Sequence, residues 1–190
     1  MEFKPWPKIP RWSRDVIITE KLDGTNASVF IPEILGDVPE GVPFLVGSRT
    51  RWITPENDNY GFATWCYKNQ EELLKLGPGH HFGEWWGAGI QRKYGLKEKH
   101  FSLFNVTKWK DGTPSPFIGI VPVLYGGPLE PGIVEAQLEI LRQRGSVASL
   151  VYEGIHFDKP EGIVIFHTGG GNYLFKKTFE KDAGGKDERA

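Results

Sequence analysis

A lysine beside a glycine turn is the first candidate for chemistry in this sequence. Lys21 lies in the run Glu20-Lys21-Leu22-Asp23-Gly24-Thr25-Asn26, which follows a β-branched stretch and is therefore expected at the end of a strand. A strand end next to a tight turn holds the backbone and aims the side chain, and a lysine amine becomes a nucleophile when burial or a neighbouring cation lowers its pKa. An ordinary hairpin with charged surface residues has the same local sequence, so the run alone is only a hint.

Three further runs place charged side chains where a nucleotide could use them. Glu84 lies among glycines and aromatic rings in 82–87, where a carboxylate could bond a sugar hydroxyl beside a stacked base. Glu161 enters an apolar strand and could hold a hydrated Mg²⁺, which binds one or two carboxylates together with phosphates. Lys176 and Lys177 lie in a strand-like run and could meet a phosphate as charge builds on it. The simpler interpretations are core aromatics, an acid that caps a strand and lysines that protect a sheet edge.

The order of these runs resembles that of the covalent nucleotidyltransferase superfamily of ATP-dependent ligases and capping enzymes. That superfamily has a Lys-x-Asp-Gly motif, an aromatic-Gly-Glu segment, a Glu-Gly-apolar strand and a final strand with lysine, and here the four span Glu20 to Lys177. Within it the sequence is most similar to the phage-type RNA ligases that seal nicks in duplexes. The similarity is carried by Asn26 after Asp23-Gly24, by Arg49 after the first hairpin, and by the segment 82–91.

The resemblance implies a role in nucleotide binding for five positions. Lys21 would accept AMP from ATP, and Glu20 would meet the adenine edge. Arg49 and Glu84 would hold the ribose and the neighbouring phosphate. Phe104 would stack on adenine, although a core strand residue is an equally good interpretation of this position.

The resemblance also implies a divalent metal, Mg²⁺ or Mn²⁺, and a final lysine. Glu161 would engage the metal, and Asn26 would position a metal-bound water. The last motif of the family reads Lys-x-Lys, whereas here the two lysines are adjacent and must face opposite sides of a strand. We favour Lys176 as the lysine that faces the site, with Lys177 as the alternative.

RNA ends or a nicked duplex are the partners that the resemblance implies. A DNA ligase, a capping-type nucleotidyltransferase that uses GTP, and a non-catalytic binder of nucleic-acid ends are the alternatives. Many relatives carry a further OB-fold or helical domain, whereas this chain ends soon after Lys177. We therefore expect a minimal ligase or one that needs an additional nucleic-acid-binding protein, and the sequence indicates no oligomeric state.

The elements that must position these residues are mostly strands. The 24 glycines and 14 prolines in 190 residues indicate many turns, and the patterns predict an α+β fold, an antiparallel-sheet nucleotidyltransferase (ATP-grasp-like ligase) domain with a few flanking helices. This domain is expected over residues 1–179, followed by a polar tail, 180–190. The predicted strands are 15–20, 27–31, 44–49, 101–108, 118–125, 162–167 and 173–177, and the predicted helices are 131–144 and a broken stretch over 59–76.

Charge and composition narrow the class of protein further. The net charge of −1 argues against a uniformly basic nucleic-acid binder. Two stretches are nevertheless basic, residues 91–110 with six Lys or Arg against Glu98, and residues 1–14 with four against Glu2, and each could follow a phosphate backbone or be a solvated face. The single cysteine, Cys66, excludes an internal disulfide and a cysteine-based zinc site. Because no run is typical of a signal peptide or of a membrane span, the cytoplasm is the expected location.

Overall fold

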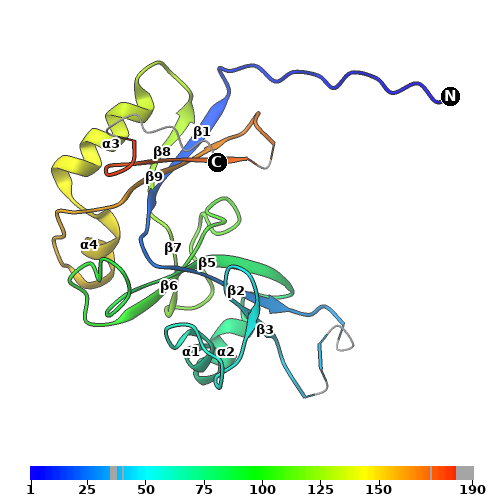
Figure 1. The fold of residues 1–190 in the computed structure, drawn as a ribbon, viewed down its shortest axis with the longest axis vertical. Coiled ribbons are helices and arrows are strands. Elements are labelled where there is room, and N and C mark those ends of the chain that lie inside the picture. The colour runs from blue at the N-terminus through cyan, green and yellow to red at the C-terminus, as the bar shows by residue number, and fades with distance from the viewer. Residues whose placement is uncertain (35–37, 40, 172, 183–190) are drawn as a thin grey trace.

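The computed structural model describes residues 1–34, 38–39, 41–171 and 173–182, which form two sheets joined end to end (Figure 1). One sheet has four strands in the order β10-β9-β1-β8, and the other has six in the order β4-β3-β2-β5-β6-β7. All neighbouring strands are antiparallel except β6 and β7. The strands are β1 (Asp15–Lys21), β2 (Thr25–Ile31), β3 (Leu45–Gly47), β4 (Trp52–Ile53), β5 (Gly79–Gly87), β6 (Lys99–Leu103), β7 (Ile118–Ile120), β8 (Val123–Pro128), β9 (Gly162–His167) and β10 (Leu174–Thr178).

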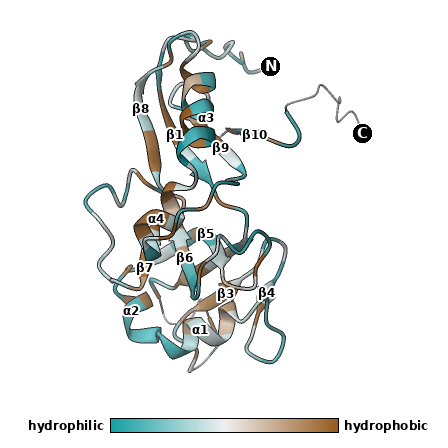
Figure 2. Cartoon of the chain, turned by 90° about the vertical axis from the view of Figure 1, so that its left-hand side faces the viewer, coloured by the Kyte–Doolittle hydropathy of each residue, from teal (hydrophilic) through white to brown (hydrophobic). Residues whose placement is uncertain are grey.

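Helices cover one face of each sheet. They are α1 (Phe62–Lys68), α2 (Gln70–Leu74), α3 (Ile133–Arg144) and α4 (Val147–Glu153). The first two pack against the six-stranded sheet in a core that includes Phe62, Leu73 and Trp85, whereas α3 packs on the four-stranded sheet through Leu138 and Leu141. Figure 2 shows α1 and α2 at one end of the molecule and α3 at the other. The faces left open by these helices are the ones available for chemistry.

The chain passes between the two sheets at two adjacent places. The turn 22–24 leads from β1 to β2, and residues 121–122 lead from β7 to β8. The two crossings touch, because the Glu20 N–H donates to the Pro122 carbonyl at 2.9 Å and because Leu22 and Val121 lie in one small core around Trp86. Lys21 is therefore the last strand residue before the chain leaves the four-stranded sheet.

The predicted α+β architecture with antiparallel strands is confirmed, as are the 162–167 hairpin strand and its partner. Two strand predictions are wrong in extent. The strand predicted over 101–108 ends at Leu103, since the Asn105 side chain accepts the Lys108 N–H at 3.0 Å and closes a turn. The strand predicted over 118–125 is two strands in different sheets, with Pro122 between them. Most of the predicted polar tail lies outside the described residues.

The predicted helices are also found. The stretch 59–76 is broken at Asn69 into α1 and α2, and the helix predicted from 131 begins at Ile133 after Gly132. Within the described parts of the chain, no helix has the length and apolar character that crossing a membrane requires.

Candidate active site

Lys21 and Glu161 meet where β1 ends and β9 begins. The Lys21 Nζ atom lies 2.6 Å from Glu161 Oε2, and the two side chains are 24% and 17% exposed. The register of the two strands makes this contact, because Lys21 pairs with Gly162, the residue after Glu161. The amine is thus held by a carboxylate 140 residues away, in a position that a small molecule can still reach.

Glu84 approaches the same point from the six-stranded sheet. It pairs with Asn26 across β2 and β5, so both side chains lie on one face, and its Oε1 accepts the Gly24 N–H at 3.0 Å. Burial raises the pKa of Glu84 to about 7, while the charge of Lys21 and the Gly24 hydrogen bond act in the opposite direction and the charge of Glu161 adds to the rise. The two sheets therefore bring Lys21, Glu84 and Glu161 into one electrostatic cluster.

The turn after Lys21 is held by groups on a distant loop. Asp23 Oδ2 lies 2.8 Å from Arg92 Nε, and the Asp23 N–H donates to the Tyr94 hydroxyl at 2.8 Å. Tyr94 is fully buried, and burial raises the pKa of its hydroxyl, so the group stays neutral. Arg92 also donates to the Lys159 carbonyl and to the Glu180 carboxylate, at 3.2 and 2.6 Å. The Arg92 guanidinium thus links the turn beside Lys21 to the segments on both sides of the β9–β10 hairpin.

Arg92 and Tyr94 were not predicted from the sequence as site residues. They lie in the stretch 91–110, for which the sequence indicates only an excess of Lys and Arg. Tyr94 has φ 51°, an uncommon backbone conformation for a bulky residue, and this reflects a tertiary packing that no local pattern reveals.

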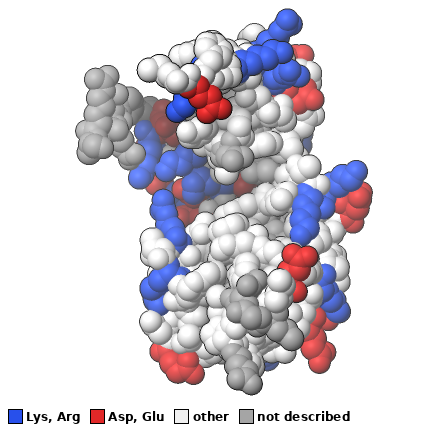
Figure 3. All heavy atoms as spheres, turned by 90° about the vertical axis from the view of Figure 1, so that its right-hand side faces the viewer, with Lys and Arg blue, Asp and Glu red and all other residues white. Residues whose placement is uncertain are grey.

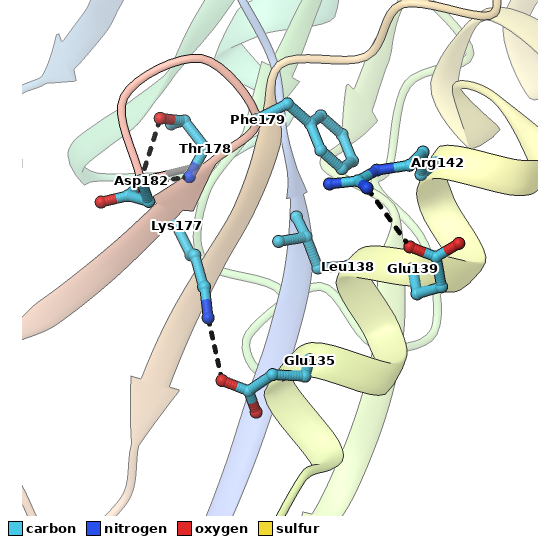
Figure 4. Close-up of a pocket in the computed structure, with 8 residues that line it drawn as sticks. All are labelled: Glu135, Leu138, Glu139, Arg142, Lys177, Thr178, Phe179 and Asp182. Carbon is cyan, nitrogen blue, oxygen red and sulfur yellow. Dashed lines mark hydrogen bonds and ion pairs between the residues drawn. The ribbon is translucent and has the colours of Figure 1, made fainter. Parts of the chain in front are cut away.

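Lys177 points away from Lys21, toward α3. It pairs with Ile163, which belongs to the core under α3, and its Nζ lies 2.8 Å from Glu135 Oε1. Figure 4 shows this lysine in a hollow between α3 and the end of β10. The hollow is lined by Glu135, Leu138, Glu139, Arg142, Lys177, Thr178, Phe179 and Asp182.

Lys176 lies on the other face of the same strand. It pairs with Val164, and Val164 pairs with Thr19 in β1. Since Thr19 and Lys21 are two residues apart in one strand, their side chains share a face, and Lys176 lies on that face too. This register favours Lys176 over Lys177 as the lysine that faces the site, and its role stays a prediction.

Glu20 has a different position from its neighbour Lys21. Its side chain is 1% exposed, and its Oε2 accepts the Ala148 N–H at 2.9 Å in the first turn of α4. Burial raises the pKa of Glu20, and hydrogen bonds from Ser146, Ala148 and Val147 offset this only in part. The carboxylate thus ties β1 to α4 rather than lining an open surface, and its predicted contact with the adenine edge stays a prediction.

Arg49 and Phe104 lie on exposed turns near the six-stranded sheet. Arg49 is exposed in the turn between β3 and β4, where the Ser48 N–H donates to the Arg51 carbonyl. Phe104 directly follows β6, and its N–H donates to the Phe82 carbonyl at 3.0 Å. With 37% of its surface exposed, Phe104 is not a core residue, so the alternative interpretation of this position is wrong. Stacking on adenine stays the prediction for it.

The open face of the six-stranded sheet continues from Glu84 into a group of contacting rings. His80 lies 3.9 Å from Phe82 and 5.6 Å from Trp52 between ring centroids, and Phe30 lies 5.9 Å from His80. Trp52 and Phe82 are 50% and 49% exposed. We call these four residues the aromatic face. Trp85 and Trp86, by contrast, are buried, so only one of the three rings around Glu84 in the sequence is available to a ligand.

A model of the RNA ligase family matches residues 14–178. The chain belongs to the RNA ligase family. The match begins just before β1 and ends at the last residue of β10, so it includes Lys21, Glu84, Glu161 and Lys176. A search of curated proteins gives no match.

Solved structures of a Naegleria gruberi RNA ligase have the same fold as this family member. A ligand-free variant superposes with a TM-score of 0.58 at 20% identity, and a variant with ATP and manganese with 0.57 at 21%. The structure with pyrophosphate gives 0.56 at 22% identity. Each alignment covers 87% of this chain. It covers only about half of the Naegleria chain, namely 50% in the ligand-free variant, 49% in the variant with ATP and manganese, and 50% in the structure with pyrophosphate. The chain thus spans about half the length of the ligase that it resembles.

We expect Arg92→Met to slow the modification of Lys21 by ATP about ten- to a hundredfold, because the turn after Lys21 loses its cationic partner and small misplacements of a nucleophile cost this much. The rate of adduct formation, followed by mass spectrometry, checks this expectation. Arg142→Met, which removes an arginine from the α3 surface, is the control and should leave the rate unchanged. An unchanged rate in Arg92→Met would mean that the ion pair between Arg92 and Asp23 does not position Lys21.

We expect wild type to lose stability relative to Glu84→Gln as the pH rises from about 4.5 to about 7. Because folding raises the pKa of Glu84 from 4.5 to about 7, its contribution is fully present below the lower value and is lost as the pH rises through the higher one. The loss is at most about 3 kcal/mol. Urea unfolding at a series of pH values measures it, and identical pH profiles for wild type and variant would contradict the expectation.

Proposed function

We propose that this RNA ligase family member is an ATP-dependent RNA ligase that forms lysyl-AMP at Lys21 and joins a 5′-phosphate to a 3′-hydroxyl. The observation that carries the proposal is the meeting of Lys21, Glu161 and Glu84 at the junction of the two sheets. Covalent transfer of a nucleotide requires a shielded but accessible amine, and the Glu161 carboxylate beside it is placed to receive the proton that the amine must lose. The match to a ligase structure with ATP and manganese supports the choice of nucleotide.

In the first step the free amine of Lys21 attacks the α-phosphorus of ATP. The N–P bond forms as the bond to the leaving pyrophosphate breaks, and the amine must lose a proton before the attack. The Glu161 carboxylate, 2.6 Å away, is positioned to accept that proton or to hold the amine until ATP binds. Lys176, on the face of Lys21, would offset the charge that builds on the phosphate.

The oxygen donors at the junction fit a hard divalent cation. Glu161 and Asn26 would hold Mg²⁺ or Mn²⁺, which when bound neutralises phosphate charge. Among the described residues, no group of three His, Cys, Asp or Glu side chains could hold a metal alone. Phosphate and water oxygens would therefore have to complete the coordination, as is usual for magnesium.

The remaining predicted residues would hold the nucleotide. Glu84 would bond the ribose, Arg49 would reach the neighbouring phosphate, and Phe104 would stack on adenine. Glu20 would act on the adenine edge from its place beneath α4. The acceptor of AMP would then be the 5′-phosphate of an RNA end, and a 3′-hydroxyl would displace AMP and seal the strand, in the cytoplasm where ATP is available.

Intact mass after incubation with ATP and Mg²⁺ tests the first half of the proposal. The expected result is a mass increase of one AMP, located at Lys21 by peptide mapping. Incubation with GTP in place of ATP distinguishes a capping-type enzyme, and no adduct with either nucleotide would overturn the proposal.

Gel assays with labelled nicked duplexes test the second half. We expect sealing of a nicked RNA strand, and faster sealing than for an all-DNA duplex of the same sequence. A preference for DNA would make the chain a DNA ligase. A protein that binds nicked RNA equally well with and without Lys21, and forms no adduct, would be a non-catalytic binder of ends.

A further inference from the structure

The residues that precede β1 form an extended segment directed away from the two sheets (Figure 1). We call residues 3–14 the N-terminal arm. Its large apolar side chains are exposed, with values of 85% for Phe3, 84% for Trp6, 76% for Ile9 and 78% for Trp12. Such a run of exposed rings is unusual for a surface that contacts only water, and indicates a binding role.

Prolines determine the backbone of the arm. Pro5, Pro7 and Pro10 each fix their own φ near −65°, and each keeps the residue before it out of the helical region. Both restrictions favour the polyproline II conformation, which has three residues per turn and a rise of about 3.1 Å per residue. The arm is therefore a semi-rigid rod, and residues three apart lie on the same edge.

The sequence of the arm has this same period of three. One edge carries Phe3, Trp6, Ile9 and Trp12. A second edge carries Pro5, Lys8, Arg11 and Arg14. The third edge carries Lys4, Pro7, Pro10 and Ser13. In the polyproline II conformation the arm thus separates an apolar edge from a cationic edge, a separation that follows from the spacing and not merely from the composition.

We propose that the N-terminal arm binds a single strand of nucleic acid, with its rings stacked on bases and its cationic edge along the phosphates. Stacking on aromatic side chains beside a positive track is how proteins bind single strands without reading their sequence. Lys8 and Arg11 lie about 9 Å apart on one edge of the rod, and Arg14 follows after the bend at 12–14, so the arm offers a series of cations to a polyanion. The identification of the strand as RNA rests on the proposed function.

The inner end of the arm is anchored on the same sheet that carries Lys21. The Trp12 indole stacks on His167 at 5.8 Å between centroids, and the Trp12 carbonyl lies 2.8 Å from His167 Nε2. His167 ends β9, and the other end of β9 begins at Gly162, opposite Lys21. Five residue steps of strand separate the two points, which is about 17 Å. The inner end of the arm is therefore one strand length from Lys21, and a nucleic-acid strand that passes this end would have to bridge that gap to reach the amine.

The arm is more cationic than the rest of the molecule. Figure 3 shows Lys and Arg side chains, interspersed with Asp and Glu, in the hollow between the two halves of the molecule. The chain as a whole has a net charge of −1, whereas residues 1–14 carry four Lys or Arg against Glu2. The arm is therefore a locally cationic element on a nearly neutral protein.

Titration of a fluorescent, unstructured single-stranded RNA with the full chain tests the proposal by anisotropy. Trp6→Ala should weaken binding about five- to a hundredfold, the range for loss of one stacked base. Phe117→Ala, which removes an exposed ring elsewhere, should have no effect. Lys8→Gln and Arg11→Gln together should lower the slope of log affinity against log salt by about 1.4.

A permuted arm separates the edge arrangement from simple charge. The combined changes F3K, K4F, K8I and I9K keep composition, charge, every proline and the Trp12 anchor, but they mix the two edges. We expect RNA binding at least tenfold weaker than wild type. The proposal would be overturned if the permuted arm bound RNA with wild-type affinity, or if no arm variant bound RNA more weakly. The exposed apolar edge would then be assigned to a groove on a partner protein.

Adenylylation separates failure of this proposal from failure of the proposed function. Arm variants should form lysyl-AMP at the wild-type rate, because the arm is anchored at the end of β9 far from Lys21. If wild type forms no adduct, the proposed function fails, yet the RNA titrations still decide whether the arm binds a strand.

Discussion

Replacing Lys21 with arginine is expected to abolish the AMP adduct while leaving the fold intact. The guanidinium keeps the positive charge that faces Glu161, so the ion pair at the junction of the sheets can persist. It cannot lose its proton at any pH at which proteins are stable, and so it cannot act as a nucleophile. Intact mass after incubation with ATP should show no mass increase, and thermal unfolding should stay within a few degrees of wild type.

The matched control is Lys177→Arg, which lies two strands away on the opposite face of the sheet. Lys177 pairs with Glu135 on α3, and the substitution keeps that pairing as well. The control variant should accept AMP like wild type. An adduct on Lys21→Arg would show that the nucleophile has been misidentified, whereas loss of the adduct in Lys177→Arg would favour Lys177 over Lys176 as the lysine that faces the site.

Gly162→Ala is expected to destabilise the protein by about 2 to 4 kcal/mol, through overpacking and backbone strain together. A Cβ at this position would lie 2.7 Å from Thr178 Cα and would collide with the Lys177 carbonyl oxygen. The backbone of Gly162 also has φ 153°, which side chains disfavour. Urea unfolding measures the loss, and because Gly162 pairs with Lys21, the yield of adduct should fall with it.

Gly126→Ala is the control for this effect of packing. Gly126 lies in β8 of the same sheet, and a Cβ there would have open space. We expect its free energy of unfolding to be within about 0.5 kcal/mol of wild type. Equal effects of the two substitutions would contradict the steric argument.

The sequence alone led to the class of fold and to most of the site because the residues that matter lie beside recognisable turns and strand ends. Lys21 precedes a glycine turn, and Glu161 precedes a β-branched strand, so each position could be placed on an element from local pattern. The alternation of side chains along a strand predicted that Lys176 and Lys177 face opposite sides, and only the register with β9 and β1 places Lys176 on the face of Lys21. The order of the motifs along the chain, and not any single residue, indicated that these positions belong to one site.

What the sequence could not supply is the set of contacts made by residues far apart in the chain. Arg92 reaches Asp23 and Glu180, and no local pattern links these positions. The carboxylate of Glu20 bonds to α4, 128 residues away. A single strand was expected over 118–125, whereas Pro122 separates two strands of different sheets, since only the tertiary structure determines which sheet each part joins.

The two adjacent crossings between the sheets make the six-stranded half a continuous insertion into the four-stranded half. Residues 22–121 leave after β1 and return before β8, and β1 and β8 are neighbours in one sheet. The insertion is attached by two adjacent chain segments, and contacts with α4 and from Arg92 also hold it to the four-stranded half. Lys21 and Glu161 both belong to the four-stranded half, whereas Asn26 and Glu84 belong to the inserted six-stranded half. The candidate site is therefore assembled from both halves, and the contacts of α4 and Arg92 fix the position of one half against the other.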